Sequence, residues 1–205
     1  SHHALKDPAH IETGDTLLIL GAAGGVGAAA IELGKVAGAK VIAAVSTQEK
    51  AEFCEQIGAD ETLIYARDLD RDGQRAFSAQ IKEVAGRDGV DIVYDAVGGP
   101  YAEPALRSLA WEGRFLVVGF PAGIPKIPLN LTLLKGCQIV GVFWGDSTRR
   151  DPKGHAKNVS ELFGMYERGQ IKPQISATFP LERTAEALMM MQDRKVMGKV
   201  VVTTD

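Results

Sequence analysis

Cysteine and excess charge are both scarce in this sequence. Two of the 205 residues are cysteines, Cys54 and Cys137, too few for a disulfide framework or a metal knuckle, and we expect both to be small buried hydrophobes. The net charge of -3 and the scattered lysines and arginines exclude the basic field that a nucleic-acid partner requires. Because membrane-length apolar runs and a signal peptide are missing, we expect no membrane partner and a cytoplasmic location.

Catalytic and metal-binding signatures are missing as well. The sequence shows no nucleophile, acid-base pair or metal-ligand cluster, so it predicts neither catalytic residues nor a metal site. The Tyr-x-x-x-Lys pair of short-chain reductases follows none of the four tyrosines. His2 and His3 suit neither a purification tag nor a metal site, because a chain terminus does not supply converging ligands.

The most informative feature that is present is an apolar run followed by a glycine-rich turn. Residues 16–20 predict a buried parallel strand, residues 21–27 form the glycine-rich segment, and helix-compatible residues follow. Ala22 replaces the first glycine of G-x-G-x-x-G, behind an extra Gly21. Bare backbone and the amino end of a helix favour an anion, so we predict a dinucleotide diphosphate at Ala23, Gly24, Gly25, Val26 and Gly27. The alternative is an ordinary tight turn.

Short apolar segments alternate with helix-length segments from residue 16 to residue 142. The expected strands are residues 16–20, 40–45, 61–65, 90–95, 113–118 and 138–142, and the expected helices are residues 26–37, 49–57, 75–85, 101–109 and 131–134. The fold class is therefore α/β, a doubly wound six-stranded parallel sheet (Rossmann fold) over residues 1–145.

The regular alternation of strands and helices stops after this domain, and we predict a C-terminal α+β extension over residues 146–205. It should contain a polar loop at 145–154, a helix at 155–168, extended chain at 174–180, a helix at 183–191 and a strand at 198–203. The last strand has no partner nearby in the sequence and fits a separate sheet.

The end of the second strand decides which dinucleotide is expected. An acid commonly stands there to bind the ribose 2′-hydroxyl, but this strand ends in Val45-Ser46-Thr47-Gln48. Without a carboxylate a 2′-phosphate is not repelled, and the hydroxyls of Ser46 and Thr47 can donate to it, so NADPH is favoured over NADH. The alternative is a capping box formed by Ser46 and Glu49, and the two interpretations are compatible.

Residues after the last three strands of the sheet should position the nicotinamide, because such folds bind ligands at the carboxyl ends of strands. The candidates are Ala96, Val97, Gly119, Phe120, Phe143 and Trp144. The aromatic residues could instead be packing residues, and Asp95 could be a loop cap or a ribose neighbour.

Four motifs together carry a resemblance to a known family. They are the glycine turn at 21–27, Gly58-Ala59-Asp60, Val93-Tyr94-Asp95-Ala96-Val97-Gly98-Gly99 and Gly198-Lys199-Val200-Val201. The chain resembles the nucleotide-binding domain of the medium-chain dehydrogenase/reductase superfamily, in its zinc-independent quinone oxidoreductase branch. The resemblance implies that Lys50, Tyr65 and Arg194 hold the 2′-phosphate and that residues 1–7 form a helix leading into the domain.

The resemblance also implies an upstream catalytic domain of β-rich, chaperonin-10-like fold, on which residues 146–205 would pack. The expected function is that of the NADPH-binding domain of an oxidoreductase that transfers a hydride to a quinone, enone or related carbonyl substrate, with the chain alone inactive. A homodimer paired through the sixth strand is also implied. The alternatives are a stand-alone NADP(H)-binding or dimerisation module without turnover, and an alcohol-dehydrogenase-like enzyme that uses NAD(H).

Overall fold

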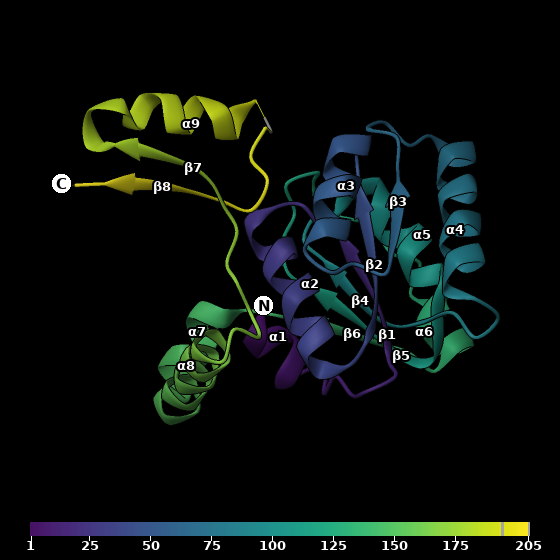
Figure 1. Cartoon of the computed structure of the whole chain (residues 1–205). Helices are drawn as coiled ribbons and strands as arrows, with labels where there is room; N and C mark the ends of the chain where they lie inside the picture. Colours follow the sequence, from purple (N-terminus) through teal and green to yellow (C-terminus); the bar gives the residue numbers. More distant parts are fainter. Residues whose placement is uncertain (194, 205) are drawn as a thin grey trace.

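The central feature of the computed structural model, which describes residues 1–193 and 195–204, is a six-stranded sheet (Figure 1). All its pairings are parallel, in the order β3-β2-β1-β4-β5-β6. The strands are β1 Thr16–Leu20, β2 Lys40–Val45, β3 Glu61–Ile64, β4 Val90–Asp95, β5 Leu109–Val117 and β6 Gln138–Gly141. The order reverses between β1 and β4, which is where ligands bind in such sheets. The predicted doubly wound fold is confirmed.

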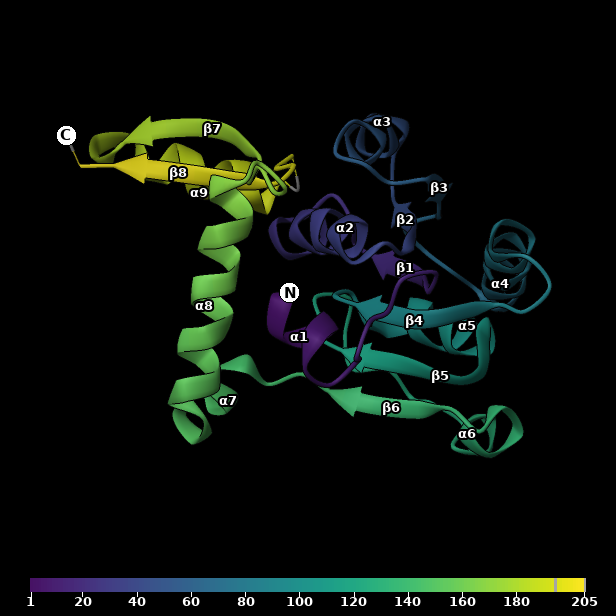
Figure 2. The same cartoon turned by 60° about the horizontal axis from the view of Figure 1, so that its bottom comes forward.

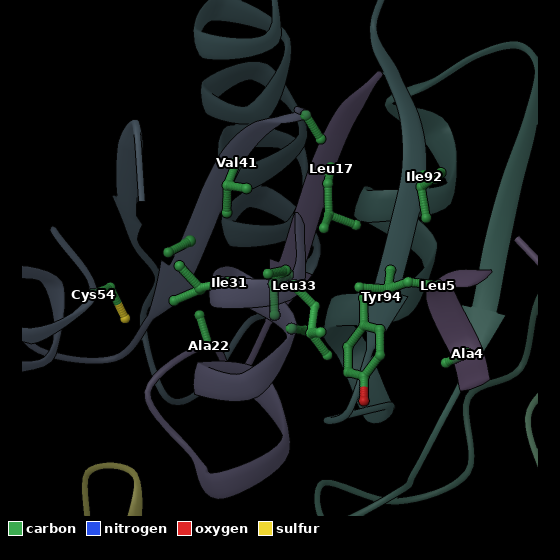
Figure 3. Close-up of a cluster of buried hydrophobic side chains, with 14 of the residues drawn as sticks. Ala4, Leu5, Leu17, Ala22, Ile31, Leu33, Val41, Cys54, Ile92 and Tyr94 are labelled. Carbon is green, nitrogen blue, oxygen red and sulfur yellow. The ribbon is translucent and has the colours of Figure 1, made fainter. Parts of the chain in front are cut away.

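Helices cover both faces of the sheet, and a hydrophobic core lies on each face. Successive residues of β1 belong alternately to these two cores. Leu17 and Ile19 belong to the core that α1, α2 and α3 cover, and Figure 3 labels Leu17, Leu5, Ile31 and Leu33 among the side chains of this core. Leu18 and Leu20 belong to the second core, with α4, α5 and α6. The helices are α1 His2–Lys6, α2 Gly25–Ala37, α3 Gln48–Gln56, α4 Arg71–Ala85, the 3-10 turn η1 Gly99–Tyr101, α5 Ala102–Arg107 and α6 Asn130–Lys135.

The remaining elements lead away from the sheet. The helix α8 (Pro152–Glu167) follows the shorter helix α7 (Trp144–Arg150) and leads to a small second sheet (Figure 2). That sheet pairs β7 (Ile175–Pro180) with β8 (Lys199–Thr203) in parallel, and η2 (Leu181–Arg183) and α9 (Thr184–Gln192) lie between them in the chain. We call the described residues of 175–203 the C-terminal unit. The prediction that the last strand belongs to a separate sheet is confirmed.

Several predicted boundaries are wrong. The helices predicted at 75–85, 101–109 and 155–168 are α4 Arg71–Ala85, α5 Ala102–Arg107 and α8 Pro152–Glu167. The polar segment 145–154 is not a loop but contains most of α7, in which Asp146 forms ion pairs with Arg149 and Arg150 one turn later. The fifth strand begins at Leu109 rather than at residue 113, so it includes a bend that interrupts its regular pattern. Glu112 takes φ 61° at this bend, and the β4–β5 register shifts there.

The chain begins with a helix that is fixed in place, as predicted for residues 1–7. Ala4 and Leu5 of α1 are buried in the first core. On the polar side His2 contacts Glu161 at 2.9 Å, and Lys6 donates hydrogen bonds to Asn158 and Glu161 of α8. The helix α1 therefore links the sheet to α8.

Both cysteines are buried and unpaired with each other, as predicted. Burial raises the pKa of the Cys54 thiol to about 12, so it stays protonated and unreactive at neutral pH. Within residues 1–193 and 195–204, no helix combines the length and apolar character needed to cross a bilayer. The same residues contain no cluster of His, Cys, Asp or Glu that could hold a metal ion.

Candidate functional site

The glycine turn (residues 21–27) connects β1 to α2 at the point where the sheet order reverses. Gly21 has φ +72°, and Gly24 caps α2 in an extended conformation, with its carbonyl accepting a hydrogen bond from the Ala28 amide at 2.8 Å. A Cβ on Gly27 would lie 2.4 Å from the Gly21 carbonyl oxygen, whereas one on Gly24 would meet only that oxygen, at 3.4 Å. Gly27 is thus needed for close packing, and Gly24 keeps the approach to the helix end open.

A cavity of about 980 Å³ opens over this turn. Nine of the predicted site residues line it: Ala23, Gly24, Gly25, Val26, Ser46, Lys50, Tyr65, Ala96 and Val97. They come from the carboxyl ends of β1, β2, β3 and β4 and the segments that follow. Gly27, Thr47, Gly119, Phe120, Phe143 and Trp144 are not among the described lining residues, and Arg194 lies outside the residues that the structure describes.

Ser46, Lys50 and Tyr65 lie together at one end of the cavity, where β2 and β3 end. The alternative interpretation, a capping box formed by Ser46 and Glu49, is wrong: the cap of α3 is Thr47, whose hydroxyl accepts from the Lys50 amide at 3.3 Å. Thr47 is one residue closer to the helix, so its side chain reaches the first-turn amide. Ser46 remains on the cavity wall as a hydroxyl donor.

An aromatic cluster supports this end of the cavity. The ring of Tyr65 lies 4.7 Å from that of Tyr101 and 5.6 Å from that of Phe77, centre to centre. Burial raises the pKa of the Tyr65 hydroxyl well above its usual range, and Tyr101 and Asp95 add to this, while a hydrogen bond with the Gly21 backbone opposes it. Tyr65 is therefore protonated at neutral pH and able to donate a hydrogen bond.

The segment after β3 contributes lining residues that the sequence did not single out: Arg67, Asp68, Leu69 and Asp70. The hydroxyl of Tyr101 donates to the carbonyls of Ala66 and Arg67 and so holds this segment against the cluster. Arg67 follows the predicted binding residue Tyr65 by two positions, and this spacing was the available sequence signal for it. Tyr101 itself, also a lining residue, follows the Gly98-Gly99-Pro100 turn.

Asp95 is buried at the end of β4, and of its two proposed roles the structure shows the loop cap. Its carboxylate accepts hydrogen bonds from the amides of Val97, at 2.9 Å, and Gly98, at 2.7 Å. Burial raises the pKa of Asp95, and these two bonds counteract the shift. Asp95 thereby fixes the turn that carries Ala96 and Val97 to the cavity.

The aromatic residues expected near the nicotinamide lie elsewhere than the cavity wall. Phe120 lies against the Gly98 turn, where an added Cβ would be 3.1 Å from its ring. Phe143 is 73% exposed and Trp144 58%, and the Trp144 ring meets His155 edge-on at 5.7 Å. Side chains as exposed as Phe143 and Trp144 do not belong to the core of this chain.

The C-terminal unit also reaches the cavity, which the sequence did not predict. Met191, Val196, Gly198, Lys199 and Val200 line it. The Gly198 amide donates to the Ala23 carbonyl at 2.9 Å, and the Lys199 ammonium donates to the Gly25 carbonyl at 3.3 Å. The available signal was the motif 198–201, which also contributes to the family resemblance.

These features fit a dinucleotide. The turn offers bare amides at the amino end of a 13-residue helix, the cavity is large enough for a cofactor, and Lys50, Arg67 and Lys199 line it. The amides suit a diphosphate, and the cations suit further phosphate groups.

Comparison with known proteins agrees with this geometry. A family model described as "Zinc-binding dehydrogenase" matches residues 25–161. A quinone oxidoreductase-like protein 2 homologue from Nematostella vectensis is 38% identical over 203 residues, 98% of this chain and 53% of that protein. An acryloyl-coenzyme A reductase from Metallosphaera sedula is 30% identical over 198 residues, 96% of this chain and 53% of that protein.

Among solved structures, a mycobacterial protein complexed with NADPH superposes with a TM-score of 0.88 at 29% identity, covering 99% of this chain and 61% of that one. The chain thus spans about half the length of the curated relatives it matches.

Proposed function

The chain belongs to the medium-chain dehydrogenase/reductase superfamily, as a nucleotide-binding domain, and on that premise we propose that it binds NADPH for a longer oxidoreductase. The proposed reaction is transfer of a hydride from NADPH to a conjugated carbonyl compound, such as a quinone or an enone. The relatives support this class, since one is named for quinones and another for an acryloyl thioester, both of which have a carbonyl conjugated to a double bond.

The observation that carries the proposal is the meeting of the glycine turn, Ser46, Lys50 and Tyr65 around one cavity. The turn would hold the diphosphate through backbone amides, and Ser46, Lys50 and Tyr65 would donate to the 2′-phosphate. No carboxylate stands at the end of β2 to favour the unphosphorylated ribose of NADH. We infer that Arg194, which lies outside the described residues, joins this group.

The chemistry belongs to the cofactor, which supplies the hydride when bound. The residues of this chain bind and orient it: Ala96 and Val97, fixed by Asp95, would shape the cavity beyond the diphosphate. We infer that Gly119, Phe120, Phe143 and Trp144 meet the nicotinamide only when a second domain closes over them. The groups that would bind the substrate and move protons are assigned to that domain.

The domain division is part of the same proposal: residues 1–145 form the NADP(H)-binding Rossmann domain, and residues 146–205 are an extension that adds side chains to the cofactor site and packs on a catalytic domain upstream. Exposed apolar side chains on the C-terminal unit support it, namely Leu181, Leu188, Met189 and Met191, each more than half exposed. Apolar surface of this kind is typical of an interface. A cytoplasmic location and independence from zinc stay predictions from the sequence.

Titration of the purified chain with NADPH and with NADH, followed by nucleotide fluorescence, tests the proposal. We expect micromolar binding of NADPH, at least tenfold weaker binding of NADH, and loss of both in Gly24→Val, whose side chain would enter the approach to the α2 amides. Tighter binding of NADH would favour the alternative of an alcohol-dehydrogenase-like enzyme. Unchanged NADPH binding in Gly24→Val would remove the diphosphate from the glycine turn.

A further inference from the structure

Three cations stand close together in the segment that follows β6, in a chain whose net charge is -3. They are Arg149 and Arg150 at the end of α7 and Lys153 in the first turn of α8, and we call them the α7 patch. The two arginine side chains are 75% and 80% exposed, and Lys153 is exposed as well. All three are therefore open to a ligand.

The carboxylates next to the patch in the sequence do not neutralise it. Asp146 is shared by both arginines, because it accepts a hydrogen bond from Arg149 at 2.6 Å and another from Arg150. Asp151 caps α8 by accepting from the Gly154 amide at 2.9 Å. One carboxylate balances one guanidinium, so the patch keeps a net positive charge.

The helix that carries the patch starts at the same edge of the sheet as the cofactor cavity. The strands are parallel, so the carboxyl end of β6, from which the chain enters α7, is at the edge that carries the glycine turn. Figure 2 shows α7 beyond the arrowhead of β6. Phe143 and Trp144, both exposed, lie at the start of α7, and a helix of 7 residues spans about 10 Å. The helix thus leads from the expected nicotinamide end to the patch.

The charge of the patch distinguishes between classes of conjugated carbonyl compound. Quinones and simple enones are uncharged and would gain nothing from these cations. A thioester of coenzyme A carries a diphosphate and a 3′-phosphate, joined to the conjugated carbonyl by a pantetheine arm long enough to follow α7. We propose that the substrate is a conjugated thioester of coenzyme A and that the α7 patch binds its phosphate groups. This inference rests on the proposed function and names its substrate class.

The reacting end of such a substrate stays with the upstream domain, and only its carrier binds to this chain. A hydride passes from NADPH to the β carbon of the conjugated double bond, and a proton from the upstream domain reaches the α carbon. The products are NADP⁺ and the saturated thioester, whose carbon–sulfur bond stays intact. The phosphate groups take no part in this chemistry, so the patch acts on affinity.

Calorimetric titration of the purified chain tests the binding, with NADP⁺ at saturation so that coenzyme A cannot enter the cofactor cavity. The probes are coenzyme A, 4′-phosphopantetheine with one phosphate, and pantetheine with none. We expect a dissociation constant for coenzyme A below about 1 mM, weaker binding of 4′-phosphopantetheine and no binding of pantetheine. Arg149→Gln/Arg150→Gln should weaken coenzyme A binding by about tenfold or more.

The matched control is Arg75→Gln/Arg107→Gln, which removes two exposed arginines from comparable ion pairs with Asp72 on α4 and Glu103 on α5. It should leave coenzyme A binding unchanged. Asp146→Asn separates charge from helix stability, because it breaks the ion pairs of α7 but keeps both arginines. We expect this variant to retain coenzyme A binding.

Unchanged coenzyme A affinity in Arg149→Gln/Arg150→Gln, or an equal loss in Asp146→Asn, would overturn the inference. Absence of coenzyme A binding by the NADP⁺-loaded chain would overturn it too, and so would equal affinity for 4′-phosphopantetheine, which acyl carrier proteins also carry. Failure of the unmodified chain to bind NADP⁺ would instead reject the proposed function. If the arginine variant does not bind NADP⁺, it is misfolded, and Lys153→Gln is judged by the same criteria.

Discussion

Gly24 and Gly27 belong to one turn, but the absence of a side chain serves a different purpose at each. At Gly27 it allows α2 to lie against the Gly21 and Ala22 backbone, and at Gly24 it leaves space for a ligand. The first is a requirement of folding and the second a requirement of binding. Substitution by alanine should therefore separate the two effects.

We expect Gly27→Ala to lower the free energy of unfolding by about 1–3 kcal/mol, because the new methyl group overlaps backbone atoms that cannot move independently. Gly24→Ala, the matched control, should cost less than about 1 kcal/mol, the difference between glycine and alanine at a helix cap. Guanidinium denaturation measures both. Equal losses would contradict the distinction.

Lys50 carries the residue-scale prediction on the choice of cofactor. We expect Lys50→Ala to weaken NADPH binding about tenfold and to leave NADH binding within twofold, because only NADPH has the 2′-phosphate that the ammonium would meet. Lys157→Ala, on the exposed surface of α8, is the control. Equal weakening of both nucleotides in a titration would refute the assignment of Lys50.

At the scale of elements, α1 and α8 are held together by polar contacts that depend on ionised carboxylates. Burial tends to raise the pKa of Asp7, but hydrogen bonds from His3 and Asn158 outweigh it, so the pKa is lowered. Hydrogen bonds from Lys6 and His2 lower the pKa of Glu161. Carboxyl groups with lowered pKa values stabilise the fold above their unfolded pKa, about 4, and lose this contribution as pH falls through the folded value.

We therefore expect Asp7→Asn to destabilise the chain slightly at pH 7, by less than about 1 kcal/mol because the contacts are partly exposed. The difference between Asp7→Asn and the unmodified chain should shrink as the pH falls below 4. Urea denaturation at pH 7, 5 and 3.5 measures it. A difference that grows toward low pH would show that the carboxylate is not the stabilising form.

The success of sequence-based prediction also differs between elements for physical reasons. The bounds of β1, β2 and β4 were predicted correctly, because these central strands are continuous apolar runs next to glycine-containing turns. The helix α7 was missed because ion pairs between polar residues, rather than an apolar stripe, stabilise it. Arg67 and Lys199 were missed because the weak signals near them, a cation two residues after Tyr65 and the motif 198–201, do not show that tertiary contacts bring both side chains to the cavity wall.

At the scale of the whole molecule, the cavity wall contains groups that bind but no group to which we assign proton transfer. We expect the purified chain to bind NADPH but not to oxidise it with a panel of quinones and enones, as followed by absorbance at 340 nm. Binding without turnover would also be the result for a stand-alone module. A longer protein that carries both this domain and an upstream catalytic domain should show turnover. Oxidation by the isolated chain at ordinary enzymatic rates would contradict the assignment of catalysis to another domain.

Self-association is the second whole-molecule prediction. The strand β6 is at one edge of the sheet, and Ile139 on it is 39% exposed. We expect the chain to form a homodimer by pairing β6 with its copy, and Ile139→Lys to shift it to monomer in sedimentation velocity, because a charge on an edge strand opposes pairing. A monomer before substitution would leave the dimer proposal without support.

The small β7–β8 sheet has a practical consequence for the preparation of this chain. Two strands provide hydrogen bonds on their shared side only, and the outward-facing amides and carbonyls of both can accept a further extended segment. We therefore expect the chain to aggregate through the β7–β8 sheet, so that the turbidity of the preparation rises with its concentration. A short lysine-bearing β-strand peptide complementary to β8 should prevent this turbidity.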